Sequence, residues 1–178
     1  LWVLDKTRTA MGARMLRSFI EQPLIDKETI EKRLEAVGVL TNDGISREEI
    51  REYLNPIYDL ERLLGKISYQ TANPRDLIAL QSSLKMLKPI RMVLEDFKGE
   101  LLQEIYEEID PLEDIYHLIE SSIQEEPPIL IREGGIIKDG FDDTIDSLRK
   151  AKTEGKKWLA DLEEEDRERT GIRNLKIK

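Results

Sequence analysis

The chain has 178 residues, a formal net charge of −9 and no cysteine. Without cysteine it can form neither disulfides nor cysteine-ligated metal sites, and its negative charge opposes tight binding of the chain alone to DNA or RNA. No apolar run approaches the roughly 18 residues of a membrane-spanning helix, and the high charged fraction is typical of an elongated helical protein.

Helix breakers divide the first two thirds of the chain into short amphipathic segments. Apolar residues at helical spacing predict a first helix over residues 7–22, and Asp26 is a suitable N-cap for a second. Pro111 separates the last two segments of this region. We therefore predict an irregular bundle of six or more helices over residues 7–125, so that the protein is mainly α.

Three further helix starts are predicted from local motifs. Ser46 with Glu49 matches a capping box, in which the glutamate reaches back to the serine amide. Asn55-Pro56 combines a capping residue with proline at the first helical position, and this helix is expected to end at Gly65. Asn73-Pro74 repeats the same start signal.

A second region follows Pro127-Pro128, where the helical body is expected to end. The isoleucine-rich residues 129–137 predict a short strand at the base of a projecting arm, and residues 172–178 alternate like a strand at its tip. Between them, about 30 helical residues span roughly 45 Å. We predict a helical core or lever domain over residues 1–128 and an arm over residues 129–178.

The predicted arm helix carries a narrow apolar stripe with near-heptad steps, which Lys152 interrupts. The residues of this stripe are Phe141, Ile145, Leu148, Leu159 and Leu162. A stripe this narrow usually packs on one partner helix, and no later helix follows in this sequence to supply one. We therefore expect the chain to be part of a longer protein.

The sequence predicts no catalytic, cofactor or metal site. The only histidine, His117, has no second histidine or cysteine at ligand spacing, and the GxxxxGK[ST] spacing of a phosphate-binding loop is absent. The last eight residues hold a local excess of positive charge through Arg173, Lys176 and Lys178. Contact with a DNA backbone and a solvated strand face are both open readings of these three residues.

Four blocks of sequence in order resemble the MutS family of bacterial DNA mismatch-repair proteins. They are LWVLDKTRTAMGARMLRSFIEQPL, IYDLERLLGKISYQTANPRDLIAL, IREGGIIKDGFDDTIDSLR and RERTGIRNLKIK. The resemblance implies the central core or lever region of such a protein together with the outgoing half of its clamp arm. It extends over nearly the whole chain, and none of the blocks holds a catalytic residue of the family.

What the family does sets further expectations. MutS proteins are dimeric ATPases that encircle DNA, recognise mismatches and recruit MutL, which implies mismatched duplex DNA, a second MutS subunit and MutL as partners of the full-length protein. It also implies ATP with magnesium as the cofactor, and a cytoplasmic location on the nucleoid. The chain would then be a connector between ATPase and clamp. The alternative is a stand-alone helical adaptor that binds other proteins through its arm.

Overall fold

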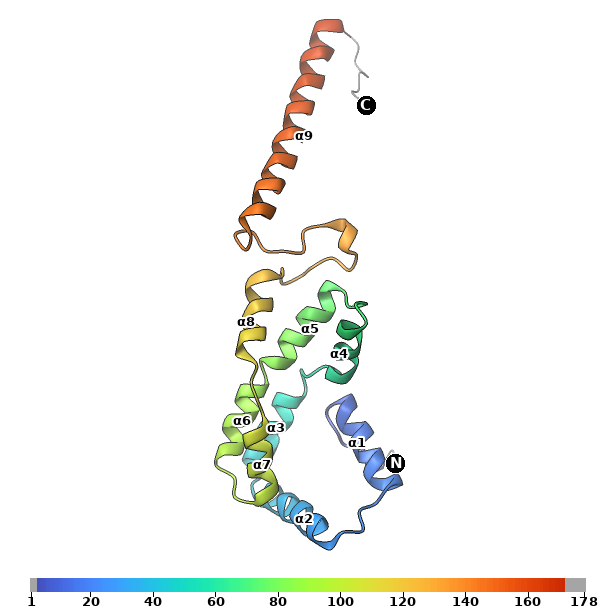
Figure 1. Ribbon diagram of the computed structural model, residues 1–178, viewed down its shortest axis with the longest axis vertical. Coiled ribbons are helices and arrows are strands. Elements are labelled where there is room, and N and C mark those ends of the chain that lie inside the picture. Colours follow the sequence, from blue (N-terminus) through green and yellow to red (C-terminus); the bar gives the residue numbers. More distant parts are fainter. Residues whose placement is uncertain (1–2, 172–178) are drawn as a thin grey trace. The chain divides into compact units, whose positions relative to one another are not determined.

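The computed structural model describes residues 3–171, and their regular structure is helical (Figure 1). The chain divides in sequence between Ile136 and Ile137 into two compact units, here called the helical unit (residues 3–136) and the arm unit (residues 137–171). The predicted mainly α fold is confirmed. The predicted domain boundary after residue 128 concerns functional domains and stays a prediction.

The helical unit is an irregular assembly of short helices, as predicted for residues 7–125. Its α-helices are α1 (Ala10–Glu21), α2 (Lys27–Asn42), α3 (Gly44–Leu54), α4 (Leu60–Ser68), α5 (Pro74–Leu84), α6 (Leu87–Glu95), α7 (Glu100–Glu108) and α8 (Glu113–Ser122). The arm unit contains α9 (Asp143–Thr170).

Several helix starts lie where the sequence predicts them. The Asp26 carboxylate accepts the Thr29 N–H at 2.8 Å and caps α2. Asn73 and Asp76 form a complete capping box at α5, because each side chain accepts the backbone N–H of the other residue at 2.9–3.0 Å. These bonds satisfy donors that have no partner within the helix.

Two predicted starts are wrong. Ser46 lies inside α3, and its N–H and hydroxyl both donate to the Asp43 carboxylate at 3.0 and 2.8 Å. Asp43 is therefore the cap, three residues before the predicted position. Asn55-Pro56 follows the end of α3, where the Asn55 N–H donates to Glu52 O.

The helix predicted after Asn55-Pro56 begins later and runs further than expected. Asp59 caps α4 by accepting the Arg62 N–H at 3.3 Å, so the helix starts at Leu60. Gly65 lies inside α4, and its carbonyl accepts the Tyr69 N–H. Glycine ends a helix when a left-handed residue is needed there, and here Gln70 adopts that conformation instead, with φ 56°.

The apolar core of the helical unit is thin and lies between pairs of helices. One cluster joins α2, α3, α6 and α7, which pack against one another. Its buried members are Ala36, Ile57, Ile90, Leu94, Phe97 and Leu102. The remaining helices follow a second line of packing, in which α5 contacts both α4 and α8 (Figure 1). These contacts, rather than helix propensity, hold such short helices in place.

Ser83 joins the segment before α4 to α5. Its side chain has no exposed surface, its hydroxyl donates to Ala79 O at 2.8 Å, and it accepts the Tyr58 N–H at 3.0 Å. A buried hydroxyl with both partners present costs little, whereas the same group without them would destabilise the fold. Ser83 therefore sets the position at which the chain enters α4.

The strand predicted over residues 129–137 is not present in the part of the chain that the structure describes. This segment contains a single 3-10 turn, η1 (Ile131–Glu133), and then Gly134 and Gly135 at φ 74° and 71°. Positive φ at two successive residues cannot continue an extended strand. One backbone bond, from Gln124 N–H to Ile136 O at 2.8 Å, fixes the end of the segment. The second predicted strand, residues 172–178, lies outside the described residues.

Candidate functional site: the arm helix and its base

The arm helix α9 has 28 residues and defined ends. At its start the Asp142 carboxylate accepts the Ile145 N–H at 2.9 Å, and Asp143 adds a second negative charge in the first turn, which the helix dipole favours. At its end Gly171 adopts the left-handed conformation with φ 70°, and its N–H donates to Arg167 O. The helix is about 42 Å long at 1.5 Å per residue.

The loop before α9 is fastened to the first two helical turns by one arginine. The Arg149 guanidinium donates to Ile137 O at 2.6 Å and pairs with the carboxylates of Asp139 and Asp146. Asp146 in turn accepts the Gly140 N–H at 2.7 Å. Sequence reasoning missed this cluster, because the loop residues that Arg149 contacts are 10 and 12 positions earlier in the chain.

The predicted apolar stripe exists on α9, but no residue of this helix is buried within the described structure. Ile145 and Leu162 are half-buried, whereas Phe141, Leu148 and Leu159 are 43%, 66% and 43% exposed. Such an exposed row of large apolar side chains at heptad spacing is typical of a helix that packs on another helix. Whether these five residues contact a partner stays a prediction.

Charge on α9 is separated along its length. Residues 149–157 hold five Lys/Arg and one Glu, a net charge of +4 by difference, whereas residues 161–168 hold six Asp/Glu and one Arg, a net charge of −5. The sequence analysis named only the last eight residues as basic and passed over the larger excess in residues 149–157. Arg173, Lys176 and Lys178 lie outside the described residues.

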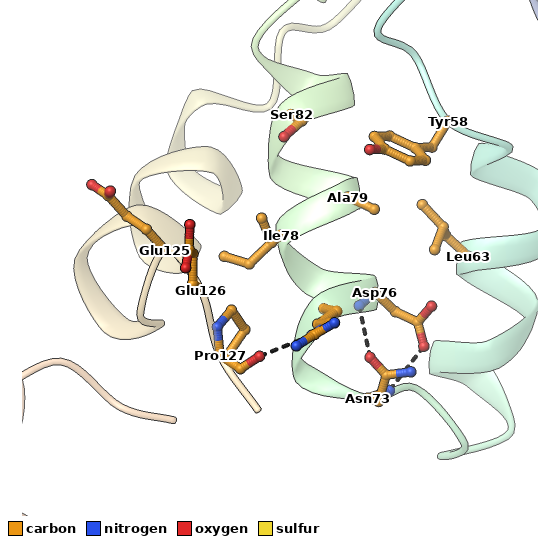
Figure 2. Close-up of a pocket in the computed structure, with 11 residues that line it drawn as sticks. Tyr58, Leu63, Asn73, Asp76, Ile78, Ala79, Ser82, Glu125, Glu126 and Pro127 are labelled. Atoms are coloured by element: carbon orange, nitrogen blue, oxygen red, sulfur yellow. Dashed lines mark hydrogen bonds between the residues drawn. The ribbon is translucent and has the colours of Figure 1, made fainter. Parts of the chain in front are cut away.

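A cleft of about 610 Å³ is found in the helical unit (Figure 2). It lies beside α4 and α5 and the segment from Glu125 to Pro127, with Tyr58 and Leu63 on one side and Ile78 on another. Its polar walls have structural work to do. Arg75 Nε donates to Pro127 O at 3.0 Å, and Asn73 caps α5.

Asp76, also in the wall of the cleft, is 2.7 Å from the Lys66 ammonium group. Burial raises the pKa of Asp76, but the Asn73 N–H and the Lys66 charge outweigh this and hold the pKa below its usual value. An ionised, paired carboxylate of this kind is a poor general acid or base. The cleft therefore offers no arrangement for catalysis that we can identify.

Other candidate chemistry is equally sparse in residues 3–171. No three His, Asp or Glu side chains there come together as metal ligands. His117 is exposed, and its Nδ1 lies 3.2 Å from the Glu120 carboxylate on the same helix. Within the same residues, none of the helices combines the length and apolar character that crossing a bilayer requires.

Comparison with known proteins tests the family resemblance directly. A family described as MutS domain III matches residues 1–176. The DNA mismatch repair protein MutS of Lachnoclostridium phytofermentans is 64% identical over 178 residues, which is all of this chain and 19% of that protein. The proteins of the same name from Caldanaerobacter subterraneus subsp. tengcongensis and Alkaliphilus oremlandii are each 52% identical over 177 residues, 99% of this chain and 20% of theirs.

The match is continuous along the chain and agrees with the four sequence blocks that carry the resemblance. The chain spans about one fifth of the length of these relatives. Both the family match and the level of identity point to the same part of the same kind of protein, so this chain belongs to the MutS domain III family.

Proposed function

We propose that this chain is a mechanical connector of a mismatch-repair ATPase. In this proposal the helical unit forms part of the core, and α9 is the outgoing lever that carries conformational change between the ATPase and a clamp around DNA. One observation supports it most: α9 has 28 residues, none of them buried, and an exposed apolar stripe at heptad spacing. A helix of that kind needs a partner helix to remain rigid.

The clip at the base of α9 supports the same role. Arg149 joins the loop carbonyl of Ile137 to the second turn of the helix, so the start of α9 is fixed to the segment before it. A lever transmits motion only if its base does not bend freely. The full-length protein would then bind and hydrolyse ATP with magnesium, bind mismatched duplex DNA, pair with a second MutS subunit and recruit MutL in the cytoplasm.

A helix-breaking substitution in α9 tests the connector role. Residues 1–178 replace the matching segment of the Lachnoclostridium phytofermentans MutS protein, which aligns over the whole chain. Ala151→Pro then interrupts the exposed middle of the helix, at a cost of about 3 kcal/mol to helix formation. Ala151→Ser is the matched control, because it keeps the backbone N–H.

We expect both chimeras to bind a mismatched duplex without nucleotide and to retain basal ATP hydrolysis. Release from the mismatch on addition of ATP, followed by fluorescence, should be slowed at least about tenfold by Ala151→Pro and unchanged by Ala151→Ser. Normal ATP-driven release with the interrupted helix would contradict the connector role. The adaptor alternative predicts this second result, since a protein-binding arm need not transmit motion.

A further inference from the structure

A group of lysines lies in the middle of α9, and the connector role gives them no use. Lys150, Lys152, Lys156 and Lys157, here called the lysine face, are all exposed. They rise about 10 Å along the helix axis, at 1.5 Å per residue. Arg149 is not counted with them, because it is occupied at the base of the arm.

The lysine face is poorly neutralised within the described residues. Lys150 lies 3.9 Å from the Glu154 carboxylate, the weakest class of contact between exposed charges. Lys152, Lys156 and Lys157 have no carboxylate within 4 Å in residues 3–171. Four positive charges on two turns of one helix repel one another, so this surface is stabilised by an anion that supplies several negative charges at once.

Most of the lysine face points away from the apolar stripe. At 100° per residue, Lys156, Lys157 and Lys150 lie about 20°, 120° and 140° to one side of Ile145. Leu148, Leu159 and Leu162 lie about 40° to 100° to its other side, and Lys152 lies at the border. A partner helix on the stripe would therefore leave at least Lys150 and Lys157 open to solvent.

The chemistry of the lysine face favours phosphate over a carboxylate-bearing peptide. Lysine ammonium groups act as flexible point charges on phosphates and do not read bases. The relatives that cover the whole chain are DNA mismatch repair proteins by name. We propose that the lysine face binds backbone phosphates of duplex DNA without reading sequence, an inference that rests on the proposed connector role.

The acidic end of the same helix limits how the duplex can lie. Residues 161–168 carry a net charge of −5 and begin about 6 Å beyond Lys157 along the axis. A duplex parallel to α9 would meet both charges. A duplex that crosses the arm meets only the lysine face, whose length of about 10 Å resembles the roughly 12 Å width of the major groove.

The test measures salt dependence on matched duplex DNA, without ATP, so that failure of the connector role does not affect it. The 178-residue chain is compared with the triple variant Lys152→Gln/Lys156→Gln/Lys157→Gln by fluorescence anisotropy between 50 and 200 mM salt. The control, Lys6→Gln/Lys85→Gln/Lys98→Gln, removes three equally exposed charges from the helical unit. Circular dichroism checks that all three proteins keep their helix content.

Each phosphate contact contributes about 0.9 to the slope of log K against log salt, so the triple variant should have a slope shallower by about 2.7. Over this salt range the unmodified chain should lose about 40-fold more affinity than the triple variant, and the control should follow the unmodified chain. Equal slopes for the unmodified chain and the triple variant, an equal change in the control, or no binding by the unmodified chain at 50 mM salt overturns the proposal. Salt-sensitive self-association of the chain that the triple variant abolishes, with DNA binding unchanged, would assign the lysine face to a second copy instead.

Discussion

The helical unit and the arm unit are both built from capped α-helices, yet they are held together by different forces. In the helical unit, apolar side chains such as Leu94 and Leu102 are buried between short helices, with exposed fractions of 5% and 4%. In the arm unit no helical residue is buried, and the printed contacts are local hydrogen bonds and ion pairs. Short helices with a core are independent of any partner, whereas a long helix without one depends on what it contacts.

The largest expected difference between the two regions is the cost of removing a leucine. Leu94→Ala should lower the free energy of unfolding by about 2–5 kcal/mol, because it leaves a cavity in the core of the helical unit. Leu148→Ala in the arm removes a side chain that is 66% exposed and should change it by less than about 0.5 kcal/mol. Urea unfolding of the 178-residue chain measures both. A cost for Leu148→Ala close to that for Leu94→Ala would show that the arm has a buried core of its own.

Loss of a helix cap should give the next largest effect, again only in the helical unit. Asn73→Ala removes the capping box of α5 and should cost about 1 kcal/mol of global stability. Asp142→Ala removes the cap of α9 and should leave the global unfolding transition unchanged while amide exchange in residues 143–149 becomes faster. Asn73→Ser and Asp142→Ser keep a capping oxygen and serve as controls. A shift of the global transition by Asp142→Ala would mean that arm and body unfold as one unit.

These caps also show how far the sequence could predict the fold. Asp26, Asn73 and the terminal Gly171 are each next to one clear change from helical to non-helical residues, and their roles follow from the local sequence. Ser46 was the wrong choice because Asp43, three residues earlier, caps the same helix. Two good capping residues in one turn compete, and the sequence alone does not decide between them.

The remaining errors arise from contacts between distant residues. The predicted start at Asn55-Pro56 ignored that the Tyr58 N–H bonds to Ser83, 25 residues later, which fixes this segment as a connection rather than a helix. The predicted strand at residues 129–137 was inferred from isoleucine content, and a strand also needs a neighbour to pair with. The stripe of α9 was predictable because it depends only on helical spacing, whereas the Arg149 clip depends on how the loop folds back.

Left-handed residues provide a smaller test of the same contrast. Gln70 follows α4 with φ 56° and an exposed side chain, so Gln70→Gly should raise the free energy of unfolding by about 0.5–1 kcal/mol by removing backbone strain. Gly171→Ala introduces the same kind of strain at the end of α9, where φ is 70°. It should make the last turn of α9 exchange faster and leave the global transition in place. Thermal unfolding with amide exchange checks both, and a destabilised Gln70→Gly protein would show that the side chain makes a contact worth more than the strain.

The smallest expected effect is a pH dependence that one carboxylate contributes to the helical unit. The Asn73 N–H and the Lys66 ammonium group lower the pKa of Asp76 in the folded protein, despite burial that raises it. The unfolded chain, with an ordinary aspartate pKa of about 3.9, therefore binds more protons than the folded chain as the pH falls through that value. The stabilisation from Asp76 is complete above the unfolded pKa and is lost as the pH falls through the lower folded pKa.

Asp76→Asn removes this titration, so the difference in stability between the unmodified chain and the variant should be constant from pH 7 to about pH 5 and should shrink below about pH 4. Urea midpoints measured at pH 7, 5, 4 and 3 follow it, and subtraction of the variant cancels the other carboxylates that titrate in both proteins. Asp161→Asn, on the exposed arm, is the control and should not change the unfolding of the helical unit at any pH. A difference between the unmodified chain and Asp76→Asn that stays constant down to pH 3 would show that the charge on Asp76 does not stabilise the start of α5. The capping box would then act through the neutral hydrogen bond from the Asp76 N–H to the Asn73 side chain alone.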